Sequence, residues 1–400
     1  MVGSYNIICF GLMPWNKMWK RNQSMMAELS KCDWVRQVLF VNPIVSLRNR
    51  FARAREKFSV SIEARNHVFP WKVSPKIVVY QPVAFLPLKT TFPSLKNIEE
   101  QIMYRVIRYL NSERPYILFM NCPNIESHHL LDRILGKSKL SIFDFSDDFA
   151  ELGNDRRTRE LFHHNSTKYA SAATMVLAVN EHVKNKYSYI NSNIHVIRNA
   201  TNYENFNRET YRTIEALEAI KRNGGPIIGY SGIANMGRID REVLDCLLSQ
   251  RPNWQFVFVG PAHSNFVDRY STCHNIHILA PVTYQDLPCY LQYFDVAIVP
   301  FQKNENTKGN DLLKLHDYLA MGKPVVSTDI GGAMDLKDII QVAQNPQEFL
   351  KSIEEVLGQP HSEEVVGQRK RVALKNSWRT RISELEAWIK GSLEGKEGII

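Results

Sequence analysis

The chain has 400 residues, of which 44% are hydrophobic and 23% charged, so its composition is that of a globular protein long enough for two domains. No apolar run reaches the roughly 20 residues of a membrane-spanning helix, and the first residues lack the basic segment that opens a signal peptide. Six scattered cysteines without CxxC or Cys/His spacing indicate reduced thiols. These features predict a cytoplasmic protein with no metal site.

The formal net charge of +9 predicts anionic partners, but charge alone does not choose among nucleic acid, phosphorylated metabolites and acidic lipid. Two segments mix basic and aromatic side chains, residues 15–21 (WNKMWKR) and 46–58 (SLRNRFARAREKF). This mixture suits an anionic membrane surface, and a solvated basic loop explains it equally well. Because the sequence has none of the compact nucleic-acid-binding signatures, we expect no nucleic acid partner.

Short runs of β-branched and aromatic residues alternate with helical stretches along the whole chain. Their apolar residues stand at consecutive positions, as strands buried on both faces require. The pattern predicts two parallel, doubly wound α/β domains in tandem. The expected strands lie at residues 6–11, 37–43, 76–82, 116–121, 140–146, 175–180 and 194–199, and then at 226–232, 255–261, 276–281, 296–301, 324–329 and 339–344.

A polar segment at residues 201–225 interrupts the strand rhythm and ends in two glycines before a proline. We therefore expect an N-terminal domain over residues 1–204 and a C-terminal domain over residues 205–375. Residues 376–400 carry apolar side chains at helical spacing. This last helix is free to cover the second domain or to return to the first.

In doubly wound sheets, ligands bind beyond the carboxyl ends of the strands, so the residues there are the candidates for a site. Ser231 and Gly232 follow the first strand of the second domain. A small residue in such a turn lets a backbone N–H approach a phosphate. The spacing differs from GxGxxG, and an ordinary βα turn explains it as well.

A polar loop at residues 302–310 precedes a helix with an apolar stripe that includes Leu315, and Asn310 or Asp311 can cap its start. Lys314 and Asp317 share another face of this helix. If its N-terminus points at a diphosphate, Lys314 would neutralise the charge and Asp317 would accept hydrogen bonds from a ribose. An exposed Asp/Lys pair accounts for the same spacing.

Asp144, Asp147 and Asp148 stand at the end of a strand in the first domain. Carboxylates crowded at one strand terminus repel each other, so at least one is a candidate base with a raised pKa. The competing interpretation is a helix cap. His163 and His164 are further candidates, although paired histidines are more often helix-surface residues.

Several motifs of the second half resemble the nucleotide-sugar-binding domain of GT-B glycosyltransferases. They are VIRNATNYENF, IIGYSG, VFVGP and LLKLHDYLAMGKPVVSTDIGG, in that order. The first half is similar to a bacterial subgroup that makes surface polysaccharides, through residues 15–43 and the run FDFSDDF. The run NSWRTRISELEAWI resembles the C-terminal helix that crosses back to the first domain in this fold.

The resemblance implies the GT-B fold, with two Rossmann-like domains and an acceptor site in the first. It also implies that Asp147, or else Asp148, is the catalytic base. Many members carry two glutamates eight positions apart; here the later one is Asp317 and the earlier falls on Gly309, which weakens the case for a retaining enzyme. The donor-binding residues that it implies are Ser231, Gly232, Arg238, Gly260, Pro300, Lys314, Leu315 and Asp317.

We therefore expect a hexosyltransferase-like enzyme that moves a sugar from a nucleoside diphosphate, with UDP favoured, to a lipid-linked or polysaccharide acceptor. The expected transfer inverts the sugar, needs neither metal nor cofactor, and takes place at the inner membrane face. The alternatives are a retaining transferase in which Asp147 only positions the acceptor, a sugar-nucleotide epimerase of the same fold, and a donor-binding subunit without activity.

Overall fold

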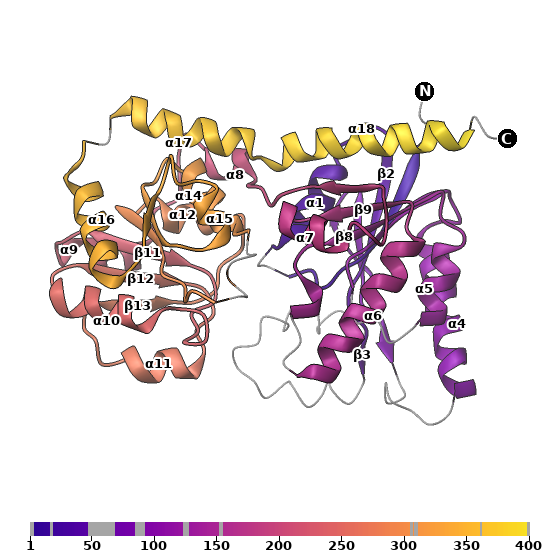
Figure 1. Ribbon diagram of the computed structural model, residues 1–400, viewed down its shortest axis with the longest axis horizontal. Helices are drawn as coiled ribbons and strands as arrows, with labels where there is room; N and C mark the ends of the chain where they lie inside the picture. The colour runs from indigo at the N-terminus through magenta and orange to yellow at the C-terminus, as the bar shows by residue number, and fades with distance from the viewer. Residues whose placement is uncertain are drawn as a thin grey trace. The chain divides into compact units, whose positions relative to one another are not determined.

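A computed structural model of the chain describes residues 4–16, 19–46, 69–84, 93–122, 128–151, 155–304, 307, 311–360 and 362–397 (Figure 1). The chain divides into two compact units. The first consists of Met1–Arg198 with Ile382–Ile400, and the second is Asn199–Arg381. None of the helices within the described ranges is both long and apolar enough to span a membrane.

The first unit is built on an eight-stranded sheet in the order β10-β9-β8-β7-β1-β2-β5-β4. Its neighbouring strands are parallel except at the edge, where β4 pairs antiparallel with β5. The strands are β1 (Tyr5–Phe10), β2 (Val35–Val41), β4 (Trp71–Ser74), β5 (Ile77–Tyr80), β7 (Tyr116–Met120), β8 (Leu140–Phe145), β9 (Met175–Ala178) and β10 (Ile194–Val196), and a separate parallel pair joins β3 (Val45–Ser46) to β6 (Val83–Ala84).

Crossover helices connect the parallel strands of the first unit, which is why the central strands are apolar on both faces. Ile7 of β1 stands between Val38 of β2 and Ile117 of β7, and all three are buried. The helices of this unit are α1 (Arg21–Leu29), α4 (Pro93–Leu110), α5 (His128–Leu135), α6 (Arg156–Ala172) and α7 (Glu181–Tyr187), with a 3-10 turn, η2 (Phe149–Glu151).

The second unit has a six-stranded parallel sheet in the order β13-β12-β11-β14-β15-β16. The chain runs outward from β11 to β13 and then restarts on the other side at β14, so the strand order reverses between β11 and β14. Ligands bind at such a switch point in doubly wound sheets. The strands are β11 (Ile227–Ser231), β12 (Gln255–Val259), β13 (Ile276–Leu279), β14 (Val296–Val299), β15 (Val325–Thr328) and β16 (Gln341–Ala343).

Helices of the second unit fill the connections between these strands. They are α8 (Tyr203–Phe206), α9 (Glu215–Arg222), α10 (Arg241–Gln250), α11 (Ser264–Tyr270), α12 (Leu287–Leu291), α14 (Leu313–Ala320), α15 (Gly331–Met334), α16 (Pro346–Gly358) and α17 (Glu363–Lys375). Every strand that the sequence predicted is present in the two sheets. The sequence analysis did not identify β3, β4 or β6, of which β3 and β6 have two residues each.

The boundary between the units lies six residues before the expected one at 204/205, because residues 199–201 hydrogen-bond to the second unit. The Asn199 backbone N–H donates to Asp311 Oδ2 at 2.6 Å, and Thr201 Oγ1 donates to Asp317 Oδ1 at 2.7 Å. The C-terminal boundary moves from 375/376 to 381/382 for the same reason, since the backbone N–H of Trp378 donates to the carbonyl of Thr201 at 2.9 Å.

Helix α18 (Trp378–Glu397) therefore begins in the second unit, and from Ile382 onward it is grouped with the first. Its buried side chains are Trp378, Ile382, Leu385, Ile389 and Leu393, which recur at helical spacing. Within the first unit, Trp388 stacks on His195 with ring centroids 4.2 Å apart.

Shortening Leu385, which is fully buried, tests this assignment of the helix. Leu385→Ala should destabilise the first unit by about 2–5 kcal/mol, because it leaves a cavity in a packed core. Hydrogen-exchange mass spectrometry should show faster exchange in β1 and β2, and the exposed control Glu394→Ala should show none. Faster exchange confined to β11 and β12 would contradict the assignment.

Candidate functional site

The turns that follow β11 and β12 pack backbone against backbone at the switch point of the second unit. Gly232 and Gly260 have φ angles of 128° and 139°, which side chains rarely allow. A Cβ atom on Gly260 would lie 2.4 Å from the carbonyl oxygen of Gly232. The two predicted glycines thus form tightly packed turns, in which Gly260 is buried and Gly232 is half-buried and carries no side chain to keep a ligand away.

The ammonium group of Lys314 lies against this turn. A Cβ atom on Gly232 would lie 2.7 Å from Lys314 Nζ, which itself stands 3.9 Å from the centroid of the Tyr230 ring and 4.9 Å from that of Phe301. The guanidinium carbon of Arg238 stands 5.6 Å from the same Phe301 ring. Two cations therefore gather over aromatic faces beside the glycine turn, an arrangement that suits a bound anion.

Three predicted donor ligands belong to the framework of this site. The backbone N–H of Ser231 does not donate to a ligand in this arrangement because it donates to the Tyr318 hydroxyl at 2.7 Å, and the Ser231 hydroxyl lies 3.0 Å from the same oxygen. The carbonyl of Pro300 accepts the N–H of Asp240 at 2.7 Å. The side chain of Leu315 is 1% exposed and packs in the core.

Asp317 lies deeper in the second unit, and it is 3% exposed. The alternative of an exposed Asp/Lys pair is therefore wrong. Asp317 Oδ1 accepts hydrogen bonds from Thr201 Oγ1 at 2.7 Å and from the Tyr284 hydroxyl at 2.9 Å. Burial raises the pKa of Asp317 to about 7, and these two hydrogen bonds oppose the shift. Asp317 Oδ2 accepts neither of these hydrogen bonds. The predicted hydrogen bond from a ribose hydroxyl therefore stays a prediction for that oxygen.

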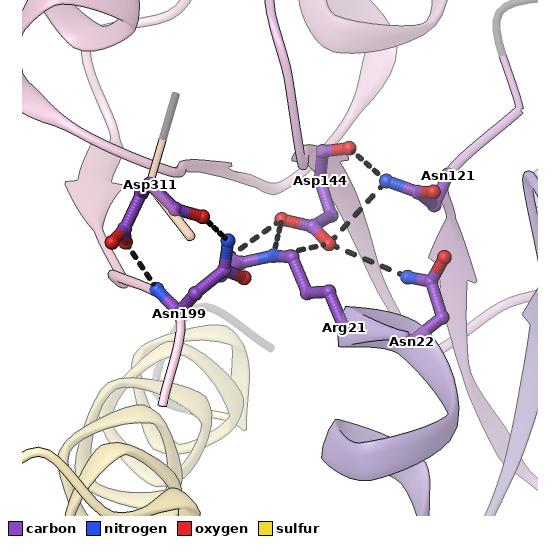
Figure 2. Close-up of polar contacts among 6 residues, drawn as sticks. All are labelled: Arg21, Asn22, Asn121, Asp144, Asn199 and Asp311. Atoms are coloured by element: carbon purple, nitrogen blue, oxygen red, sulfur yellow. Dashed lines mark hydrogen bonds and ion pairs between the residues drawn. The ribbon is translucent and has the colours of Figure 1, made fainter. Parts of the chain in front are cut away.

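Asp311 does not cap α14 as expected, because the N-cap position belongs to Leu312, which makes no side-chain capping bond. Instead Asp311 holds Asn199: its Oδ2 accepts the Asn199 backbone N–H, and its carbonyl accepts the Asn199 side-chain amide, both at 2.6 Å (Figure 2). His316 Nε2 lies 3.7 Å from Asp311 Oδ1. The other expected cap, Asn310, and Gly309 lie outside the described residues.

In the first unit, Asp144 at the end of β8 is fully buried and receives the guanidinium of Arg21 (Figure 2). Arg21 Nε lies 3.1 and 3.0 Å from the two carboxylate oxygens, and its terminal nitrogen lies 2.9 Å from Oδ1. The side-chain amide of Asn121 donates to the Asp144 carbonyl at 2.5 Å. Asp144 is thus a structural ion-pair partner that fixes the end of the strand.

The same ion pair removes Arg21 from the predicted membrane surface at residues 15–21, where Trp19 and Lys20 are half-buried and Lys17 and Met18 lie outside the described residues. Arg21 is 4% exposed, and Trp15 is buried with its ring 5.0 Å from that of Phe40. Neither side chain is available to a bilayer. The second expected basic segment, residues 46–58, lies outside the described residues except for Ser46.

Asp148 and Asp147 follow Asp144 in the turn after β8, and each has its own partner. Asp148 accepts a hydrogen bond from Lys186 Nζ at 2.6 Å on one oxygen and from the Tyr187 hydroxyl at 2.9 Å on the other. Asp147 Oδ1 accepts the backbone N–H of Asp148 at 2.9 Å. The repulsion expected among these carboxylates stays a prediction, and Asp147 is the better candidate for a base because both oxygens of Asp148 are engaged.

Of the other sequence candidates, His163 lies beside the turn after β8, with its ring centroid 6.3 Å from that of Tyr187. His163 and His164 are exposed on α6, as paired helix-surface histidines would be. All six cysteines are free thiols. Among the residues that the structure describes, no three His, Cys, Asp or Glu side chains come together to hold a metal ion, and the predicted metal independence stays a prediction.

Comparison with known proteins identifies a domain family in the second unit. Residues 238–359 match the family model "Glycosyl transferases group 1". TuaH of Bacillus subtilis (strain 168), named as a teichuronic acid biosynthesis glycosyltransferase, is 24% identical over 192 residues. That match spans 46% of this chain and 48% of TuaH, about half the length of the relative.

Solved structures share the fold over nearly the whole chain. Sucrose-phosphate synthase from Thermosynechococcus elongatus has a TM-score of 0.67 at 13% identity, covering 98% of this chain and 100% of that one. HepE from Anabaena, in complex with UDP and glucose, also has a TM-score of 0.67, at 11% identity, covering 97% and 100%. At such identities the likeness establishes the fold, and the expected GT-B fold is confirmed.

Replacing Arg21 leaves the buried Asp144 carboxylate without its ion-pair partner, which should lower the free energy of unfolding. Arg21→Met should destabilise the first unit by about 3–5 kcal/mol, and Arg21→Met/Asp144→Leu should recover part of that loss. Urea unfolding, monitored by hydrogen exchange of the β8 amides, measures the loss of stability in the single and in the double variant. The control Arg156→Met breaks an exposed ion pair with Glu160 and should cost about 1 kcal/mol or less. Equal losses in the two single variants would contradict the role of the buried pair.

The raised pKa of Asp317 predicts a pH dependence of stability. Aspartate in the unfolded chain titrates near pH ~3.9, so between that pH and about 7 the folded protein binds more protons. The free energy of unfolding of the second unit should therefore fall as the pH rises from about 4 to about 7, and it should level off above that range. Asp317→Asn keeps an acceptor for Thr201 and Tyr284 and should lack this dependence. Parallel stability curves for the two proteins would show that Asp317 does not titrate there.

Proposed function

We propose that this chain, which has a GT-B fold and a glycosyl transferases group 1 domain at residues 238–359, is a glycosyltransferase that uses a nucleoside-diphosphate sugar, with UDP favoured. The observation that carries the proposal is the Lys314 ammonium beside the Gly232 turn at the strand switch point. The complex of HepE with UDP and glucose supports the class of donor. The name of TuaH supports a cell-surface polysaccharide as the class of product.

The second unit would hold the donor through its diphosphate. The lack of a side chain at the half-buried Gly232 allows close approach, while Lys314 and Arg238 supply positive charge. When the bond between the sugar and the diphosphate breaks, negative charge accumulates on the departing nucleoside diphosphate. A fixed cation stabilises that charge more than it stabilises the intact donor, which accelerates the transfer. The Tyr230 and Phe301 rings hold Lys314 in position for this role.

The first unit would supply the base. Asp147 takes the proton of the acceptor hydroxyl while the acceptor oxygen bonds to the sugar carbon and the bond to the diphosphate breaks, which inverts that carbon. Asp148 acts as a positioning residue, because Lys186 and Tyr187 fix its side chain and its backbone N–H donates to Asp147. The proposed reaction needs no metal, and its acceptor is lipid-linked or a growing polysaccharide at the inner face of the membrane, where the chain is a peripheral protein.

Donor binding tests the role of Lys314. Titration calorimetry with UDP-, GDP-, dTDP- and CMP-sugars should detect binding to one nucleotide class, and Lys314→Ala should weaken it by about 10- to 100-fold, as expected for a lost charge-assisted contact. Lys351→Ala, which removes an exposed lysine on α16, is the matched control. Equal affinities of Lys314→Ala and wild type would place the donor elsewhere.

Substitutions in the turn after β8 test the base. Asp147→Asn should bind the donor normally and lose transfer by about 10²- to 10⁴-fold, because it cannot accept the proton. Asp148→Asn should chiefly lower the stability of the turn, since its bonds to Lys186 and Tyr187 weaken. The anomeric configuration of the product distinguishes inversion from retention. Full turnover by Asp147→Asn would move the base to another residue.

A further inference from the structure

Helix α4 (Pro93–Leu110) of the first unit carries an outward face with large apolar side chains. Ile98 is 56% exposed, Ile102 53% and Tyr109 81%. Together with the exposed Arg105 they stand at positions i, i+4, i+7 and i+11, which fall on one side of a helix. The opposite side packs into the core through Met103, Tyr104 and Ile107. The helix is thus apolar on both sides, and the described part of the chain buries one of them in its core.

A basic groove of about 940 Å³ adjoins this face. Arg105 and Tyr109 belong to both, and the groove also contains Arg108 and Arg133. The guanidinium carbon of Arg133 lies 4.1 Å from the centroid of the Tyr104 ring, and Lys137 Nζ lies 5.9 Å from it. Cations held over an aromatic face are already oriented toward an anionic ligand.

Two acidic side chains near the groove have basic partners, while Glu99 and Glu100 of α4 are half-buried and buried, respectively. Glu113 lies 2.9 Å from Arg108, and Asp132 lies 3.0 Å from Lys168 of α6. Arg105, Arg133 and Lys137 therefore add to the positive charge of the surface. A face of isoleucine and tyrosine bordered by arginine is the composition of a helix that lies in the interface of an anionic membrane.

We propose that the outer face of α4 and the adjoining basic groove form the surface by which this protein docks on an anionic lipid bilayer. Ile98, Ile102 and Tyr109 enter the boundary between headgroups and acyl chains, and Arg105 and Arg133 contact lipid phosphates. Arginine and tyrosine also occur in protein interfaces, so a protein partner is a separate outcome of the test. The inference rests on the proposed function only in that a lipid-linked acceptor requires such a membrane.

Co-sedimentation with vesicles tests this surface without any sugar donor. Wild type should bind vesicles of phosphatidylcholine mixed with phosphatidylglycerol, bind phosphatidylcholine alone far less, and detach as salt is raised. Arg105→Gln/Arg133→Gln should lower the partition coefficient about thirtyfold, since two cations are lost near an anionic surface. Ile98→Gln/Ile102→Gln should lower it about tenfold or more. All four side chains are exposed, so the variants should fold.

The matched control is Arg157→Gln/Leu161→Gln, which removes one exposed arginine and one exposed apolar residue from α6. It should bind the mixed vesicles as wild type does. Absence of wild-type binding, or an equal loss in this control, would overturn the proposal. The proposal would also be overturned if an α4 variant kept its vesicle binding and lost only self-association, measured by sedimentation velocity. Donor titration of the same variants should be unchanged, and a failure of donor binding in wild type would count against the proposed function and leave the vesicle result standing.

Discussion

The close approach of two backbone turns is the constraint on which the site of the second unit depends. The carbonyl of Gly232 occupies the space that a side chain at position 260 would need, and the Lys314 ammonium occupies the space beside Gly232 itself. Any residue larger than glycine would push these groups apart. The N–H groups of Gly232 and Gly260 already donate to the carbonyls of Val259 and Leu279, so the switch point offers a diphosphate a turn without side chains and one fixed cation.

Lys314 keeps its place because α14 is attached to the rest of the second unit along its length. Asp311, just before the helix, accepts two hydrogen bonds from Asn199. Asp317, in the middle of the helix, accepts hydrogen bonds from Thr201 and Tyr284. The hydroxyl of Tyr318 accepts a hydrogen bond from the backbone N–H of Ser231. These bonds join α14 and Asp311 to three parts of the chain, residues 199–201, Tyr284 and Ser231. A binding lysine on a helix fixed in this way loses little conformational freedom when the ligand arrives, which favours tight binding.

Much of the fold follows from local sequence, and much of the site does not. Consecutive apolar residues identified the buried parallel strands because crossover helices cover both of their faces. The position of Lys314 after a strand and a polar loop also pointed to the donor site. Helical spacing, however, shows which residues share a face and not what covers it, so the burial of Asp317 under Tyr284 was not predictable. The Arg21–Asp144 pair was missed because its partners lie 123 residues apart.

The most direct test of the donor-site assignment is a crystal structure of the protein with UDP. The account predicts that the diphosphate lies against the Gly232 turn, with a phosphate oxygen hydrogen-bonded to Lys314 Nζ, and that a ribose hydroxyl reaches Asp317 Oδ2. A UDP molecule bound with its diphosphate away from Lys314 and the Gly232 turn would contradict the account.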